Sequence, residues 1–178
     1  MKSDIENYEV AEKLTNAIND IIPELERLRD KSLLTIEFDK YERNIKAIYT
    51  KIDEVKGIGA TATSKILHLL NPDLFVMWDQ NIRSEWNRCL DEKNFKEFKE
   101  NIGRITETAT SYVRFMQLMQ KVGNEFLEEY MKERGIQDRN KAEEMLSKEY
   151  CGKSIVKLLD EYNWLIATGR VRNLNGTY

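Results

Sequence analysis

Apolar residues recur at intervals of three and four along most of the chain, a spacing that places them on one face of an amphipathic α-helix. No segment alternates apolar and polar residues as a half-buried strand does. Pro23 is expected to open a helix of its own, because its missing N–H is harmless in a first turn. The other helices are predicted over 4–20, 38–54, 61–70, 79–89, 95–121, 124–134, 139–150 and 153–167. We therefore expect an all-α fold, with two small lobes around a cleft as one arrangement of these helices.

Composition favours a single domain over residues 1–178. A chain of 178 residues and 21.0 kDa can bury one ordinary core. With 41% hydrophobic and 33% charged residues, it falls outside the disordered class. The polar N-terminus does not resemble a signal peptide, and no apolar run approaches the roughly 20 residues of a membrane span. We expect a cytoplasmic, monomeric protein without a membrane partner.

Few residue types here favour metal chemistry. Cys89 and Cys151 have no neighbouring Cys or His at metal-ligand spacing, so we expect reduced structural thiols and no metal site. His68, the one histidine, lies among Ile and Leu residues and is expected to be buried or at the core boundary with one hydrogen bond.

The most informative segment is a glycine turn between two predicted helices, Val55-Lys56-Gly57-Ile58-Gly59-Ala60-Thr61. Glycine permits a positive φ and lets another backbone approach closely. The N–H groups that begin the second helix would point outward and could bind an anion. Ile58 would pack into the angle between the two helices and fix it. Such a turn can hold a DNA phosphate through backbone amides, which need no lysine.

This segment resembles the helix-hairpin-helix DNA glycosylase superfamily, in which an aspartate at the head of a helix follows the hairpin's second glycine by about 20 residues. Asp79, in Val76-Met77-Trp78-Asp79-Gln80-Asn81, falls at that spacing. The resemblance covers about residues 52–86, with the hairpin at about 45–70 and the aspartate helix at about 79–89. It implies a partner, duplex DNA with a damaged or modified base, and no cofactor except a monovalent cation at the hairpin.

Two departures refine the expected activity. Relatives that cleave the DNA backbone carry a lysine two residues after the second glycine, where this chain has Thr61, so the resemblance implies a monofunctional glycosylase without a Schiff base. Asn81 stands in place of the family's histidine. Trp78 is expected to line a base pocket. The residues expected to contact DNA are Lys56, Gly57, Ile58, Gly59, Thr61, Lys65, Asn81 and Arg83, and Arg170 and Arg172 add a small basic tail.

Asp79 is the candidate catalytic residue, because a nearby anion stabilises the oxocarbenium character that develops when an N-glycosidic bond breaks. It could also activate the attacking water. The alternative is that Asp79 only caps its helix. Three hypotheses therefore stay open: a glycosylase, a non-catalytic helix-hairpin-helix module that binds DNA or protein, and a helical interaction protein in which the turn is merely a tight connection. The net charge of −3 and pI near 5.5 argue mildly against a nucleic-acid partner.

Overall fold

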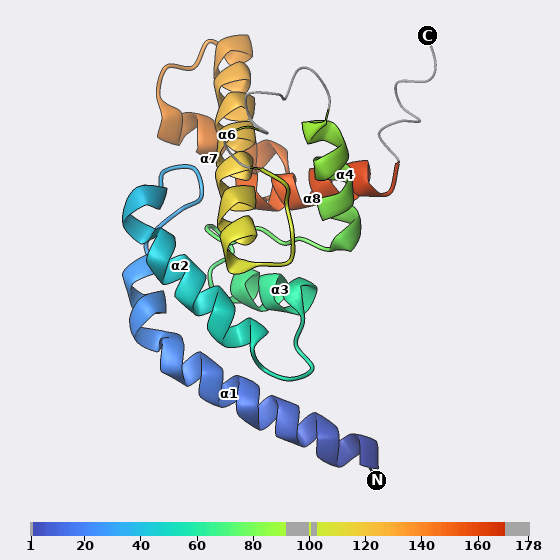
Figure 1. The fold of residues 1–178 in the computed structure, drawn as a ribbon. Coiled ribbons are helices and arrows are strands. Elements are labelled where there is room, and N and C mark those ends of the chain that lie inside the picture. The colour runs from blue at the N-terminus through green and yellow to red at the C-terminus, as the bar shows by residue number, and fades with distance from the viewer. Residues whose placement is uncertain (1, 92–99, 101–102, 170–178) are drawn as a thin grey trace.

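The computed structural model describes residues 2–91, 100 and 103–169, with side chains from residue 8 onward. In this part of the chain all regular secondary structure is helical and no strand is present, which confirms the all-α class. Figure 1 shows the arrangement. The helices are α1 (Lys2–Leu28), α2 (Phe38–Asp53), α3 (Ala60–Leu70), α4 (Gln80–Leu90), α6 (Ala109–Arg134), α7 (Arg139–Glu149) and α8 (Ile155–Ala167).

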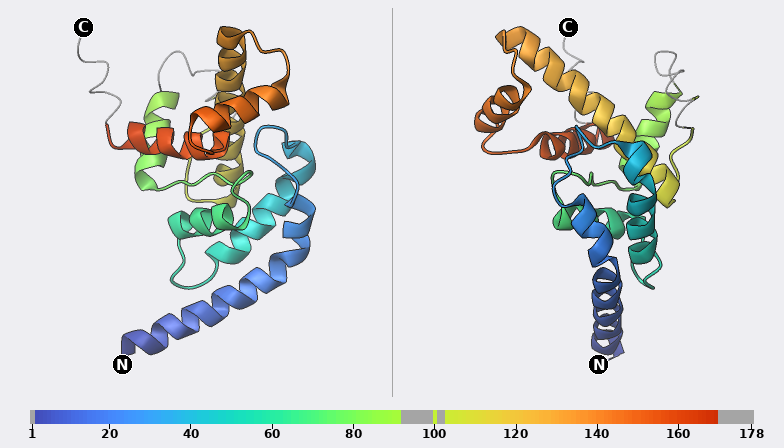
Figure 2. Two further views of the ribbon diagram at one scale, coloured as in Figure 1. Left: turned by 180° about the vertical axis from the view of Figure 1, so that it is seen from behind. Right: turned by 90° about the vertical axis from the view of Figure 1, so that its left-hand side faces the viewer.

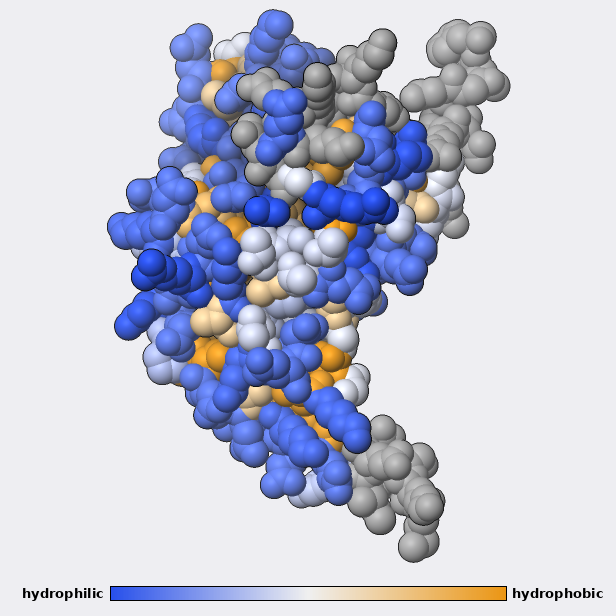
Figure 3. Space-filling model, in the orientation of Figure 1, coloured by the Kyte–Doolittle hydropathy of each residue, from blue (hydrophilic) through white to orange (hydrophobic). Residues whose placement is uncertain are grey.

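The centre of the fold is the packing of α2 against α6, with α1 on the other side of α2. Ile45, Ile48 and Ile52 recur at three- and four-residue intervals along α2 and are all fully buried. From α6, Phe115 and Met119 enter the same core. The N-terminal part of α1 extends beyond this body, as both views in Figure 2 show. Hydrophilic residues cover most of the face shown in Figure 3, with smaller apolar areas between them.

Two predicted helix breaks are wrong, because packing overrides the local signal. Pro23 does not open a new helix but lies inside α1, and the buried Ile21 and Leu28 on either side of it hold the helix to the core. Gly123 likewise lies inside α6 rather than between two helices. A Cβ at Gly123 would lie 2.7 Å from Leu34 Cδ2. This glycine is therefore a point of close packing.

The predicted helix over 95–121 is interrupted: residue 100 is helical, but α6 begins at Ala109. Thr108 caps α6 by accepting a hydrogen bond from Ser111 N, at 3.2 Å. Residues 103–108 are not helical. Asn87 of α4 holds this segment, since its side chain donates to Ile105 O and accepts from Ile105 N, both at 2.8 Å. The early part of the predicted helix, apart from residue 100, lies outside the described residues.

Candidate nucleic-acid interface and active site

The glycine turn joins α2 to α3 as a short, partly fixed connection. Ile58 N donates to Val55 O at 2.8 Å, and Ile58 packs half-buried against the core. Gly57 has φ +97°, a conformation that favours glycine. Gly59 is different: its φ of −111° suits any residue, and a Cβ there would meet nothing within 4 Å. Gly57 therefore serves the protein's own conformation, whereas Gly59 faces open space.

The start of α3 offers backbone donors to a ligand. Gly59 occupies the N-cap position, and among the described residues no side chain caps this helix. The intrahelical ladder begins with Thr63 N donating to Gly59 O at 2.9 Å. The earlier N–H groups, including that of the half-buried Thr61, have no carbonyl within the helix to bond. They form the kind of donor set that binds phosphate.

Charged residues of both signs lie beside this turn. Lys56 and Lys65 are exposed, as a phosphate contact requires. Lys13 of α1 and Lys51 of α2 line a hollow of about 360 Å³ beside Lys56, and the acidic Asp20 and Glu54 line it as well. Lys51 Nζ lies 2.7 Å from Asp20 Oδ2, which raises the pKa of Lys51. The sequence did not indicate Lys13, because it reaches this hollow only through the packing of α1 along α2.

The inner side of the turn is tied together by polar side chains. Thr63 Oγ1 donates to Asp53 Oδ1 at 3.3 Å, which links the end of α2 to the first turns of α3. Burial raises the pKa of Asp53, and the negative charge of Glu107 adds to the effect. Burial also raises the pKa of the neighbouring Tyr49 hydroxyl, again with the charge of Asp53 adding to it. These groups lie beneath the turn rather than on its outer surface.

Asp79 stands at the N-cap of α4, as the sequence predicted. Its backbone is extended, and Oδ1 accepts a hydrogen bond from Ile82 N at 2.8 Å. The other oxygen, Oδ2, has no hydrogen-bond partner among the described residues, and the side chain is half-buried. Trp78 Nε1 donates to Ala60 O at 3.1 Å, so the residue before Asp79 is bonded to the first residue of α3. The residue before Asp79 is therefore tied to the helix that follows the glycine turn.

Trp78 itself is not available for a base, which corrects the prediction that it lines a pocket. Its side chain is 0% exposed. The ring packs edge-on against Tyr112, with 5.1 Å between centroids, and against Tyr49 at 6.1 Å. With Phe115 at 5.6 Å these rings form one aromatic cluster. No face of the Trp78 ring is open for stacking.

Arg83 is also a correction, because it points inward instead of toward a phosphate. Only 5% of the residue is exposed, and its guanidinium carbon lies 5.0 Å from the centre of the Trp78 ring. Nη2 pairs with the Glu107 carboxylate, and Nη1 is buried with no hydrogen-bond partner in the described part of the chain. A cation held over an aromatic face and paired with an acid is a structural contact. Asn81, by contrast, is exposed on the first turn of α4.

Side chains from α3 and α6 hold the segment before Asp79. From α3, Ser64 Oγ accepts from Trp78 N at 3.1 Å, and His68 Nδ1 lies 2.7 Å from Phe75 O. From α6, the Tyr112 hydroxyl donates to Val76 O at 2.8 Å. His68 is half-buried with this bond, as the sequence predicted. Consecutive backbone groups are thus held up to the residue before Asp79.

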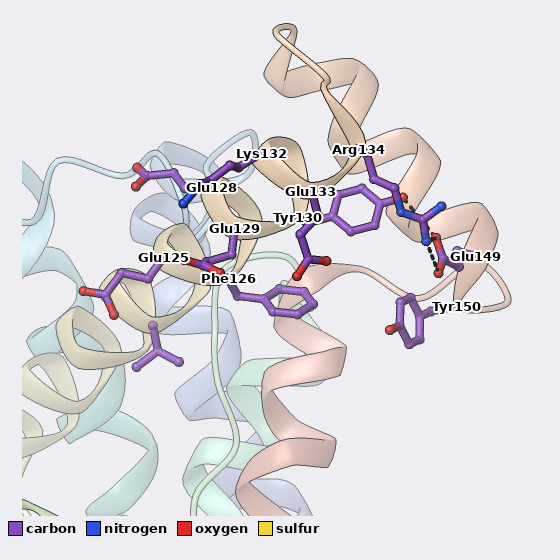
Figure 4. Close-up of a pocket in the computed structure, with 11 residues that line it drawn as sticks. Glu125, Phe126, Glu128, Glu129, Tyr130, Lys132, Glu133, Arg134, Glu149 and Tyr150 are labelled. Carbon is purple, nitrogen blue, oxygen red and sulfur yellow. Dashed lines mark hydrogen bonds and ion pairs between the residues drawn. The ribbon is translucent and has the colours of Figure 1, made fainter.

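A separate hollow of about 900 Å³ lies between α6 and α7 (Figure 4). Phe126, Tyr130 and Tyr150 form its aromatic part, and Arg134 bonds Glu149 at its edge. Its other acidic lining residues are Glu125, Glu128, Glu129 and Glu133. This density of negative charge repels phosphate, so the hollow is a poor surface for DNA. The cleft that we expected in front of Asp79 stays a prediction.

The two cysteines differ in burial. Cys89 is half-buried and Cys151 exposed, both as thiols, so Cys151 has no core role. Arg170 and Arg172 lie outside the described residues. The monovalent cation at the hairpin stays a prediction.

No family model, curated protein or solved structure matches this chain. Among the helices that the structure describes, none is long and apolar enough to cross a membrane.

Proposed function

We propose that this protein is a monofunctional DNA glycosylase that removes a damaged or modified base by hydrolysing its N-glycosidic bond. The observation that carries this proposal is the bond between Trp78 Nε1 and Ala60 O, which ties the residue before Asp79 to the first residue of α3. An anion-binding turn and a carboxylate then act on the same stretch of DNA. The exposed Gly59, Lys56 and Lys65 support a contact with the phosphate backbone.

In this mechanism the amides at the start of α3 bind a phosphate of the damaged strand. Lys56 and Lys65 attract the phosphate backbone electrostatically, an attraction that salt weakens. The Asp79 carboxylate faces the sugar as the glycosidic bond breaks and stabilises positive charge at C1′. The unpartnered Oδ2 also has the capacity to accept a proton from the attacking water. With Thr61 at the position of the lyase lysine, no amine attacks the sugar, and water completes the reaction.

A second function, a non-catalytic DNA-binding module, is favoured by one observation: Asp79 already serves as a helix cap through Ile82 N. The two functions differ in whether a base is released. The protein would be incubated with duplexes carrying deaminated, alkylated, oxidised or hypermodified bases, including modified phage DNA. A glycosylase releases free base and leaves an alkali-labile abasic site. Duplex binding without release from any member of the panel would favour the module.

A further inference from the structure

Helix α8 contacts the Asp79 region on both sides of the carboxylate. Asp160 Oδ1 accepts a hydrogen bond from Met77 N at 3.0 Å, two residues before Asp79. Asn163 Oδ1 accepts from Trp86 Nε1 at 2.8 Å, on the helix that Asp79 caps. Asp160 and Asn163 are three residues apart on α8, so they lie on the same face of the helix. One helix face therefore fixes both the segment that leads to Asp79 and the helix that follows it.

These two contacts are polar and deeply buried, and burying polar groups costs folding free energy. Asp160 is 5% exposed and Asn163 is 0% exposed. Among the described residues, Asp160 Oδ2 is buried without a hydrogen bond, and His68 Nδ1 lies 3.5 Å from it. An apolar residue would be less costly at this depth. What an apolar residue cannot supply is the acceptor for Met77 N.

We propose that Asp160 and Asn163 are positioning residues for Asp79, which hold its carboxylate at the start of α4 in the orientation used for base excision. This inference rests on the proposed glycosylase function. Neither residue touches the DNA in this account, because both act through backbone and side-chain bonds to the element that carries Asp79. A displacement of about 1 Å at a catalytic group is enough to lower a rate by about a hundredfold.

The contact itself is tested by amide hydrogen exchange, which needs no substrate. In Asp160→Ala, Met77 N loses its acceptor, and we expect its exchange to become at least tenfold faster. Asp160→Asn keeps an acceptor oxygen and should hold the rate within about threefold of the wild type. Leu159→Ala, next to Asp160 and buried in the same helix, is the matched control: it removes core packing but leaves the Met77 bond in place.

The effect on catalysis is measured on a duplex that the wild type cleaves, well below the unfolding temperature of each variant. Asp160→Ala and Asn163→Ala should lower kcat at least tenfold while the affinity for DNA stays within about twofold. Asp160→Asn should recover kcat to within about threefold, and Leu159→Ala should keep it despite its loss of stability. An equal loss of kcat in Asp160→Ala and Leu159→Ala would overturn the positioning role.

The contact with α8 and the glycosylase function can be refuted separately. An unchanged Met77 exchange rate in Asp160→Ala overturns the contact with α8, whatever the wild type excises. Faster exchange together with a wild type that releases no base from any duplex overturns the glycosylase assignment and, with it, the catalytic role of Asp160. Faster exchange and a selective loss of kcat support both.

Discussion

Replacing Asp160 by Asn should make the protein more stable at neutral pH, although the residue is buried and hydrogen-bonded. Burial raises the pKa of Asp160 from an ordinary 3.8 to about 6. The bond from Met77 N and the neighbouring His68 and Lys157 oppose this rise, and Glu161 adds to it. The folded state therefore binds a proton that the unfolded state releases. Stability from this group is fully present below pH 3.8 and is lost as the pH rises through 6.

The size of the effect follows from the same values. A pKa difference of this size means that the ionised Asp160 lowers the free energy of unfolding by about 3 kcal/mol at pH 7.5. Asn removes the charge and keeps an acceptor for Met77 N, so Asp160→Asn should gain up to about 3 kcal/mol at pH 7.5 and almost nothing at pH 4. Urea unfolding followed by far-ultraviolet circular dichroism, at several pH values for both proteins, gives this difference. A variant that is less stable at pH 7.5, or a gain that does not change with pH, would refute the reasoning.

Three further predictions concern the interface. Gly57→Ala should lower the free energy of unfolding by about 1 kcal/mol, because Gly57 has a positive φ. Gly59→Ala should lower it less but weaken DNA binding more, because the new Cβ enters the space of an approaching phosphate. Urea unfolding and a binding titration separate the two effects. Lys56→Gln and Lys65→Gln should each reduce the slope of log affinity for DNA against log salt by about one ion. Arg83→Gln should lower stability and leave this slope unchanged, because Arg83 is buried. Equal slopes in all three variants would show that Lys56 and Lys65 do not contact the phosphates. Borohydride should trap no covalent adduct with a cleaved duplex; an efficient adduct would point to Lys65 as an amine nucleophile.

Features set by neighbouring residues could be predicted from the sequence. The periodicity of α2, the glycine turn, the start of α3 and the capping aspartate of α4 all depend on residues within a few positions of one another. Asp79 is at an N-cap because an aspartate side chain reaches the N–H three residues later, a local geometry. The same holds for the stop of α2 near Gly57.

Features set by distant residues could not be predicted. Trp78 and Arg83 are residue types that are common in binding sites. Both are buried here, because they pack against Tyr49, Tyr112 and Glu107. Pro23 and Gly123 signal breaks locally, yet tertiary packing keeps both helices continuous. Asp160 and Asn163 lie far along the chain from the residues they bond, so no local pattern indicates their role.

The central claim, that Asp79 is catalytic and not only a cap, is tested most directly by the single-turnover excision rate of Asp79→Asn. Asn caps a helix about as well as Asp, so stability should change by less than about 0.5 kcal/mol, and binding of the duplex should persist. Asp73→Asn, an exposed aspartate in the preceding loop, is the matched control and should excise at the wild-type rate. We predict that excision by Asp79→Asn falls by about a hundredfold or more, as expected when one preorganised charge is lost. Excision by Asp79→Asn at the wild-type rate would contradict the catalytic assignment and leave Asp79 as a helix cap.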